Sequence, residues 1–138
     1  MDLAKLDLEA AASSGIKVKL THPVTQEVLE DSKGKPLVIV ILGRDSKQWQ
    51  REAKKQSSQQ SKKYKGSIPT DQVEKSLRKI MAACTIEFPN NNIEFEGKKV
   101  KCEPEAVLEL YNARPWIAEQ MAQAAADRSQ LFLGPEEN

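Results

Sequence analysis

The apolar run PLVIVIL, residues 36–42, is the feature that most constrains how this chain of 138 residues can fold. It lies between Gly34 and Gly43 and is rich in β-branched residues, which favour strands. Because no polar residue interrupts the run, both of its faces need to be covered by other parts of the protein. The run therefore predicts a central strand in a small sheet.

Two shorter segments are expected to join this strand in an antiparallel sheet. Residues 16–21 alternate apolar and polar side chains, which is typical of a half-buried strand, and His22-Pro23 ends the pattern. Residues 24–30 predict a short second strand. Residues 16–43 are therefore assigned to a β region, and residues 1–15 are a candidate mobile N-terminal arm that contains a short helix.

A polar segment, residues 44–66, follows and contains eight basic and two acidic residues. Asp45 or Ser46 can cap a helix at its start. The first half of this basic helix is expected to pack on the core through Trp49 and Ala53. The second half has almost no apolar residues, so core burial cannot hold it, and it is expected to fray or be disordered.

The same segment is the candidate contact surface for a partner. Basic side chains interleaved with aromatic ones can bind phosphates and stack on bases, but a net charge of +1 for the whole chain argues against nucleic acid. An acidic protein partner or a solvated arm is the preferred interpretation. The candidate partner-binding residues are Trp49, Arg51, Lys54, Lys55, Lys62, Lys63 and Tyr64.

The remaining sequence predicts a mainly helical region, residues 67–133, and a tail, residues 134–138. Thr70 is expected to cap an amphipathic helix that runs to Cys84. A β-hairpin around Gly97 interrupts the helical region before its last two helices. The fold class is α+β in a single domain, residues 1–138. It consists of a small N-terminal antiparallel sheet, a basic helix, and a helical C-terminal half with an inserted β-hairpin and a terminal helical hairpin.

The terminal helical hairpin is expected to consist of a helix from Pro104 and a second helix that ends before Gly134-Pro135. An arginine, Arg128, falls within the apolar stripe of the second helix. It can extend outward to solvent, or it can pair with Glu105 or Glu109 on the preceding helix, which is the expectation preferred here. Trp116 can be a core residue, as preferred, or an interface anchor. The expected structural residues of the second helix are Trp116, Ile117, Met121, Arg128 and Phe132.

No set of residues in the sequence converges on catalytic chemistry. Phosphate-binding loops and serine-nucleophile motifs are missing, and the single histidine, His22, precedes a proline at an expected surface turn. Cys84 and Cys102 form no C-x-x-C pair and are expected to be buried free thiols in a reducing compartment. The sequence therefore predicts no enzyme activity, no cofactor and no metal site. It also shows no signal peptide and no apolar run long enough to cross a membrane, so a cytoplasmic location is expected.

The two halves of the chain differ in charge. Residues 1–69 carry a net charge of +5 and residues 70–138 a net charge of −4. This asymmetry permits self-association through opposite charges, or one-sided binding to another molecule.

Two stretches of the chain share an order of residues with a known family. The first is VIVILGRDSKQWQREAKKQ, residues 38–56. In the second, Ala82-Ala83-Cys84 leads into the Gly97 hairpin and a helix begun by Pro104. The second stretch ends with Pro115-Trp116-Ile117, Glu119-Gln120, Asp127-Arg128 and Phe132. Across residues 16–133, the order resembles that of the tail assembly chaperones of long-tailed, siphovirus-like bacteriophages and prophages.

The resemblance implies a non-enzymatic protein that acts in the host cell cytoplasm. Such chaperones bind the tape measure protein, help to recruit the tail tube protein, and are generally absent from the finished virion. The alternatives are a structural virion protein, such as a connector or a tail-end component, and a nucleic-acid-binding protein that uses the basic segment.

Overall fold

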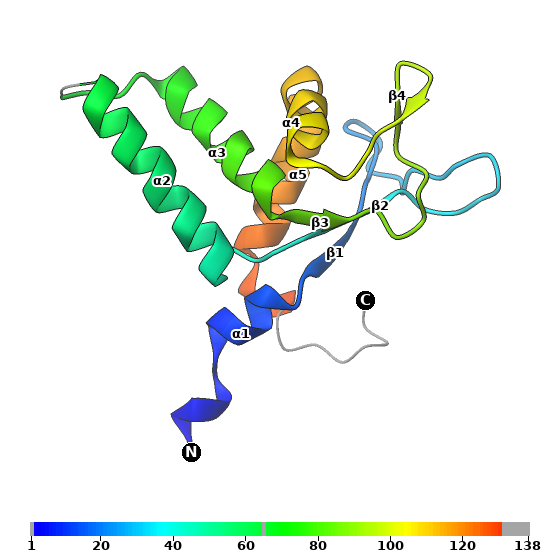
Figure 1. The fold of residues 1–138 in the computed structure, drawn as a ribbon. Helices are drawn as coiled ribbons and strands as arrows, with labels where there is room; N and C mark the ends of the chain where they lie inside the picture. Colours follow the sequence, from blue (N-terminus) through cyan, green and yellow to red (C-terminus); the bar gives the residue numbers. More distant parts are fainter. Residues whose placement is uncertain (1, 65, 131–138) are drawn as a thin grey trace.

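The computed structural model describes residues 2–64 and 66–130 and has an α+β fold (Figure 1). Its helices are α1 (Leu8–Ser13), α2 (Lys47–Lys63), α3 (Thr70–Cys84), α4 (Pro104–Ala113) and α5 (Pro115–Ala126). Its strands are β1 (Ile16–Lys19), β2 (Val38–Ile41), β3 (Thr85–Glu87), β4 (Glu94–Phe95) and β5 (Lys98–Lys99). Two short 3₁₀ helices are η1 (Leu3–Lys5) and η2 (Arg128–Gln130). The predicted fold class is confirmed.

The apolar run at 36–42 supplies the middle strand of the sheet, as predicted. The strand order is β1-β2-β3, and both pairings are antiparallel. All four residues of β2 are buried, whereas β1 pairs Ile16 with Ile41 and leaves Lys17 and Lys19 exposed. Coverage of both faces of β2 explains why its sequence lacks the alternation seen in β1.

The third strand of the sheet is β3, so the prediction of a strand over residues 24–30 is wrong. That segment forms a turn with only isolated bridges, Thr21 to Val28 and Glu30 to Pro36. The turn is stabilised by His22, whose Nδ1 accepts hydrogen bonds from the backbone N–H groups of the residues two and three positions later. A positive φ of 63° at Gln26 also breaks extended structure there.

The strand β3 follows α3 without a loop, which explains why the sequence pattern did not reveal it. A buried hydrogen bond between two hydroxyl groups connects the start of β3 to α4: the Oη of Tyr111 lies 2.7 Å from the Oγ1 of Thr85. Since the Thr85 hydroxyl donates to the carbonyl oxygen of Met81 at 2.8 Å, Tyr111 is the donor of the pair. Burial raises the pKa of Tyr111, so its hydroxyl stays protonated.

Helix α3 lies between α2 and α4 and contacts both of them (Figure 1). Pro104 and Pro115 begin α4 and α5, and the two helices form the predicted terminal helical hairpin. Ile117 and Met121 are buried in the core as predicted, and Trp116 packs half-buried at its edge.

The helix α5 ends at Ala126, earlier than predicted. The next residue, Asp127, has an extended backbone, and its carboxylate accepts a hydrogen bond from the N–H of Ser129. Such local side-chain bonds compete with helical ones and favour a helix end. Arg128 is therefore outside the helical stripe to which the sequence assigned it. Phe132, the last expected structural residue, lies outside the described residues.

The helix α2 is continuous to Lys63, so the prediction that its second half loses helical structure is wrong. Polar contacts take the place of apolar packing there: the Nε2 of Gln60 donates to the carbonyl oxygen of Gln72 at 3.1 Å and contacts the Oγ of Ser76 on α3. At the other end, Ser46 caps α2 as predicted, since its Oγ accepts from the Trp49 N–H.

The structure also shows how α3 begins and where α1 lies. The prediction that Thr70 caps α3 is wrong, because the helix begins at Thr70 and its cap position is Pro69, which makes no side-chain bond. The candidate mobile arm at 1–15 includes α1, which packs against the body of the protein: Ala12 is fully buried and its carbonyl oxygen accepts from Gly43.

Residues 42–44, here called the 42–44 junction, connect β2 to three helices. The backbone N–H groups of Leu42, Gly43 and Arg44 donate to the carbonyl oxygens of Cys84, Ala12 and Ala125, each at 2.9 Å. These acceptors lie at or near the C-terminal ends of α3, α1 and α5. A Cβ atom at Gly43 would lie 2.8 Å from that of Ala12, so only glycine allows α1 to dock this closely.

Gly43→Ala is therefore expected to lower the free energy of unfolding by about 1–3 kcal/mol, the usual cost of overpacking. Urea denaturation followed by circular dichroism measures this difference. The matched test is a double-mutant cycle with Ala12→Gly, which removes the clashing methyl group. The double variant should be less destabilised than the sum of the single variants. Additive effects would show that contact with α1 is not the reason for the glycine.

Candidate protein-interaction surface

The two cysteines are free thiols, as predicted. Cys84 is buried, and burial raises its pKa to about 12. Burial also raises the pKa of the half-buried Cys102, and the nearby Glu87 carboxylate raises it further. Both side chains are therefore protonated near neutral pH and are poor nucleophiles.

Within residues 2–64 and 66–130, no group of three or more histidine, cysteine or acidic side chains is arranged to hold a metal ion. None of the helices in the same residues is sufficiently long and apolar to cross a membrane. The candidate partner-binding residues of the sequence lie on α2 and just beyond its end.

The helix α2 has two opposite faces. One face packs on the protein through Trp49, Ala53, Gln56 and Gln60, which recur at helical spacing. The other face carries the basic stripe, defined as Lys47, Arg51, Lys54, Lys55 and Lys62, all of which are exposed. Since α2 has 17 residues, the stripe extends along a helix of about 25 Å.

The structure divides the seven candidate partner-binding residues between these faces. Trp49 is only 6% exposed and belongs to the core, so its assignment as a partner contact is wrong. Its indole is the main apolar anchor of a helix that is otherwise polar, which is why it is buried. Arg51, Lys54, Lys55 and Lys62 lie on the exposed stripe. Lys63 is exposed at the end of α2, and its Nζ lies 5.5 Å from the centre of the half-buried Tyr64 ring.

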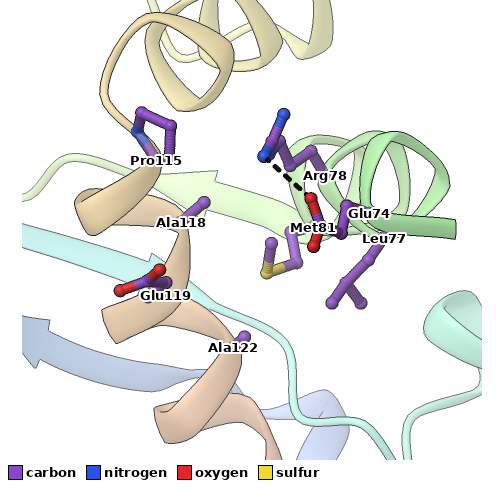
Figure 2. Close-up of a pocket in the computed structure, with 8 residues that line it drawn as sticks. All are labelled: Glu74, Leu77, Arg78, Met81, Pro115, Ala118, Glu119 and Ala122. Carbon is purple, nitrogen blue, oxygen red and sulfur yellow. Dashed lines mark ion pairs between the residues drawn. The ribbon is translucent and has the colours of Figure 1, made fainter. Parts of the chain in front are cut away.

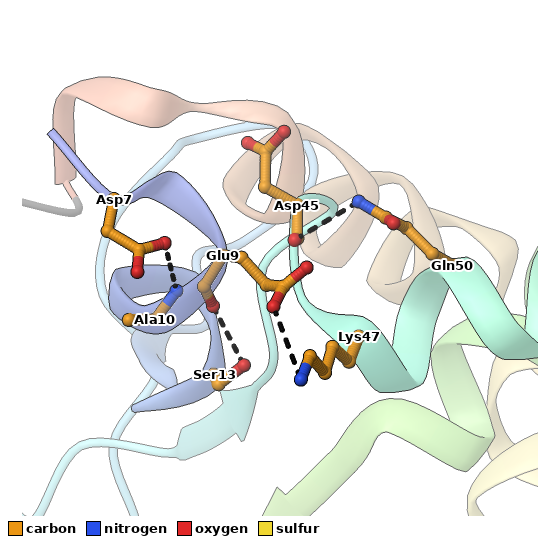
Figure 3. Close-up of polar contacts among 7 residues, drawn as sticks. All are labelled: Asp7, Glu9, Ala10, Ser13, Asp45, Lys47 and Gln50. Carbon is orange, nitrogen blue, oxygen red and sulfur yellow. Dashed lines mark hydrogen bonds and ion pairs between the residues drawn. The ribbon is translucent and has the colours of Figure 1, made fainter. Parts of the chain in front are cut away.

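Most of the charge on the basic stripe is free to attract a partner. In the described part of the chain, no carboxylate lies within 4.0 Å of Arg51, Lys54, Lys55 or Lys62. Lys47, at the start of the stripe, is paired with Glu9 of α1 at 3.7 Å (Figure 3). The available positive charge therefore lies along the middle and the C-terminal part of α2.

The predicted partner of Arg128 is wrong: the guanidinium binds Asp45, not Glu105 or Glu109. Its Nε and Nη2 donate to the two carboxylate oxygens of Asp45 at 2.9 and 2.8 Å. Arg128 is beyond the end of α5, and that end lies beside the 42–44 junction, which brings it to the start of α2. The Arg128–Asp45 pair holds the chain just beyond α5 against the start of α2. The hydrogen bonds from Arg128 lower the pKa of Asp45.

Sequence reasoning missed a groove between α3 and α5, here called the α3/α5 groove (Figure 2). Its volume is about 170 Å³. It is lined by Glu74, Leu77, Arg78, Met81, Pro115, Ala118, Glu119 and Ala122. The sequence predicts an amphipathic helix here, but part of its apolar face stays accessible, since Val73 is 50% and Leu77 38% exposed. The signal that could have revealed the groove is the series of alanines on α5, which are too small to cover that face.

Comparison of the chain with protein-family models, curated protein sequences and solved structures found no significant match.

Arg128→Gln is expected to lower the melting temperature at neutral pH because it removes the two hydrogen bonds to Asp45. The folded protein lowers the pKa of this carboxyl group, so the stabilisation is present above the ordinary aspartate value of 3.8 and disappears as the pH falls through the lowered pKa. Melting curves recorded from neutral to acid pH should therefore converge for the parent and the variant. Lys79→Gln, which removes an exposed charge from α3, is the control. A difference that persists in acid would contradict the role of the Asp45 pair.

The thiols are expected to differ in reactivity towards a small aromatic disulfide reagent. In the native protein, Cys102 should react slowly, and Cys84 should react only when the protein unfolds, because it is buried and protonated. Labelling of the Cys102→Ser variant, with and without denaturant and followed by mass spectrometry, isolates Cys84. Rapid native labelling of this variant would show that the core around Cys84 opens easily.

Proposed function

We propose that this protein is a non-enzymatic tail assembly chaperone of a long-tailed bacteriophage or prophage. In this function it binds the tape measure protein in the host cytoplasm, assists the recruitment of tail tube subunits, and leaves before the virion is complete. The observation that carries the proposal is the basic stripe, an exposed row of basic side chains on a helix whose opposite face packs on the protein. The order of residues that resembles these chaperones supports the choice of partner.

The way α2 is held suits the recognition of a long protein partner. Ser46 and Trp49 secure its start, and Gln60 secures its second half to α3. Because the helix is held at both ends, the stripe presents its charges at fixed spacing, and less conformational entropy is lost on binding than with a free basic arm. Its complement is a protein surface with carboxylates at helical spacing, and a partner of this kind is attracted over a long range.

Nucleic-acid binding is the second candidate, and the same basic stripe favours it. However, base stacking requires accessible aromatic side chains. Trp49 is buried, and Tyr64 at the end of α2 is half-buried. The burial of Trp49 therefore favours a protein partner.

The test is charge reversal of Lys54, Lys55, Lys62 and Lys63 to glutamate in the full chain. Co-purification with the co-expressed tape measure protein of the same phage or prophage is expected to fall at least about tenfold, since each exposed charge contributes to steering and retention. The control reverses four exposed lysines elsewhere, Lys17, Lys19, Lys75 and Lys79, and changes the net charge by the same amount. This control should retain the tape measure protein.

Unchanged co-purification after charge reversal on α2 would overturn the role of the stripe. Steeply salt-dependent retention of a labelled oligonucleotide, lost in the same variant, would favour nucleic acid instead. Detection of the protein in purified particles by mass spectrometry would favour a structural virion protein, such as a connector or a tail-end component.

A further inference from the structure

We propose that the α3/α5 groove binds an amphipathic α-helix of another protein whose apolar face is bordered by lysine or arginine residues. This site is separate from the basic stripe and does not depend on the function proposed above. Three properties of the groove define the occupant: its apolar floor, its acidic borders and the low wall on the side of α5.

The floor of the groove is apolar and partly open to solvent. Val73, Leu77 and Met81 follow one another at intervals of four residues along α3 and so form one line on its surface. Met81 is buried at the base, while Leu77 and Val73 are 38% and 50% exposed. Leu77 and Met81 extend from α3 into the space that faces α5 (Figure 2). Two exposed aliphatic side chains one turn apart therefore continue the groove into a longer apolar line.

The wall on the α5 side is low because it is made of small residues. Pro115, Ala118 and Ala122 line it at helical spacing, and Ala118 is buried against the core. Small side chains allow a third helix to approach closely and to place its apolar residues between α3 and α5. A cavity of about 150 Å³ accommodates a benzene-sized group. The groove, at about 170 Å³, therefore has room for a large apolar side chain of the partner, and Val73 provides contact for another one turn away.

The charges at the opening favour a basic partner. Glu74 on α3 has a side chain 63% exposed, and Glu119 on α5 is also exposed. The one basic group that lines the groove, Arg78, is only 20% exposed. Its guanidinium lies 3.9 Å from Glu74 and donates to the Oδ1 of Asn112 at 3.4 Å, so it is directed partly towards α4. The exposed charge at the borders is therefore negative, opposite in sign to the basic stripe on α2.

The experiment uses the full chain and two labelled, end-capped peptides of four helical turns. Both peptides carry leucines on one face, and the residues that border this face are lysine in the first peptide and glutamate in the second. Fluorescence anisotropy is expected to show saturable binding of the lysine peptide. Leu77→Gln should weaken it by about fivefold or more, because an apolar contact is lost. The double variant Glu74→Gln/Glu119→Gln should also weaken it and reduce its dependence on salt.

The matched control is Ile86→Gln, since Ile86 is a similarly exposed aliphatic residue on β3 that does not line the groove. It should leave the affinity for the lysine peptide unchanged, and melting curves of all variants verify that they fold. Equal affinity of Leu77→Gln and the parent, or no saturable binding below about 1 mM, would overturn the site. Binding of the glutamate peptide that depends equally on Leu77 would overturn the charge assignment. Dimerisation abolished by Leu77→Gln in sedimentation experiments would assign the groove to a second copy of this chain.

Discussion

The close contact of Gly43 with Ala12 is the constraint on which the rest of the structure depends. The 42–44 junction carries three successive N–H groups that bind α3, α1 and α5, and this arrangement requires α1 to lie against the backbone without an intervening side chain. The same junction leads directly into Ser46 and the start of α2. The direction of the basic helix, the end of the terminal helix and the position of the sheet are therefore determined at one place, where the buried strand β2 ends.

The position of α2 leaves two surfaces whose exposed charges have opposite signs. One face of α2 is used for anchoring, through Trp49 near its start and Gln60 near its end, and this leaves the basic stripe on the outside. On the far side of α3, the groove towards α5 has acidic borders from Glu74 and Glu119. The two surfaces therefore differ in the sign of their exposed charge.

Features that depend on a pattern within one helix or strand were predicted well from the sequence, whereas contacts between elements were not. The unbroken apolar run gave the central strand, and Pro104 gave the start of α4. The strand β3 was missed because three residues are too few to establish alternation. Part of the candidate site also followed from the sequence, since charged residues such as Lys54 on a helix with few apolar residues are exposed in most arrangements. Trp49 could be assigned to either face until its surroundings were known, because tryptophan is frequent both in cores and at interfaces.

The sequence by itself determined the α+β class, the central position of β2 and the basic character of α2, because these depend on local composition and periodicity. Only the tertiary structure decided which residue pairs with Arg128, since Asp45 lies 83 positions away in the sequence and is brought near by the 42–44 junction. It also decided that Leu77 stays partly exposed, because the facing helix presents alanines. Contacts of this kind depend on how far apart two packed elements lie, and no pattern along a single chain specifies that distance.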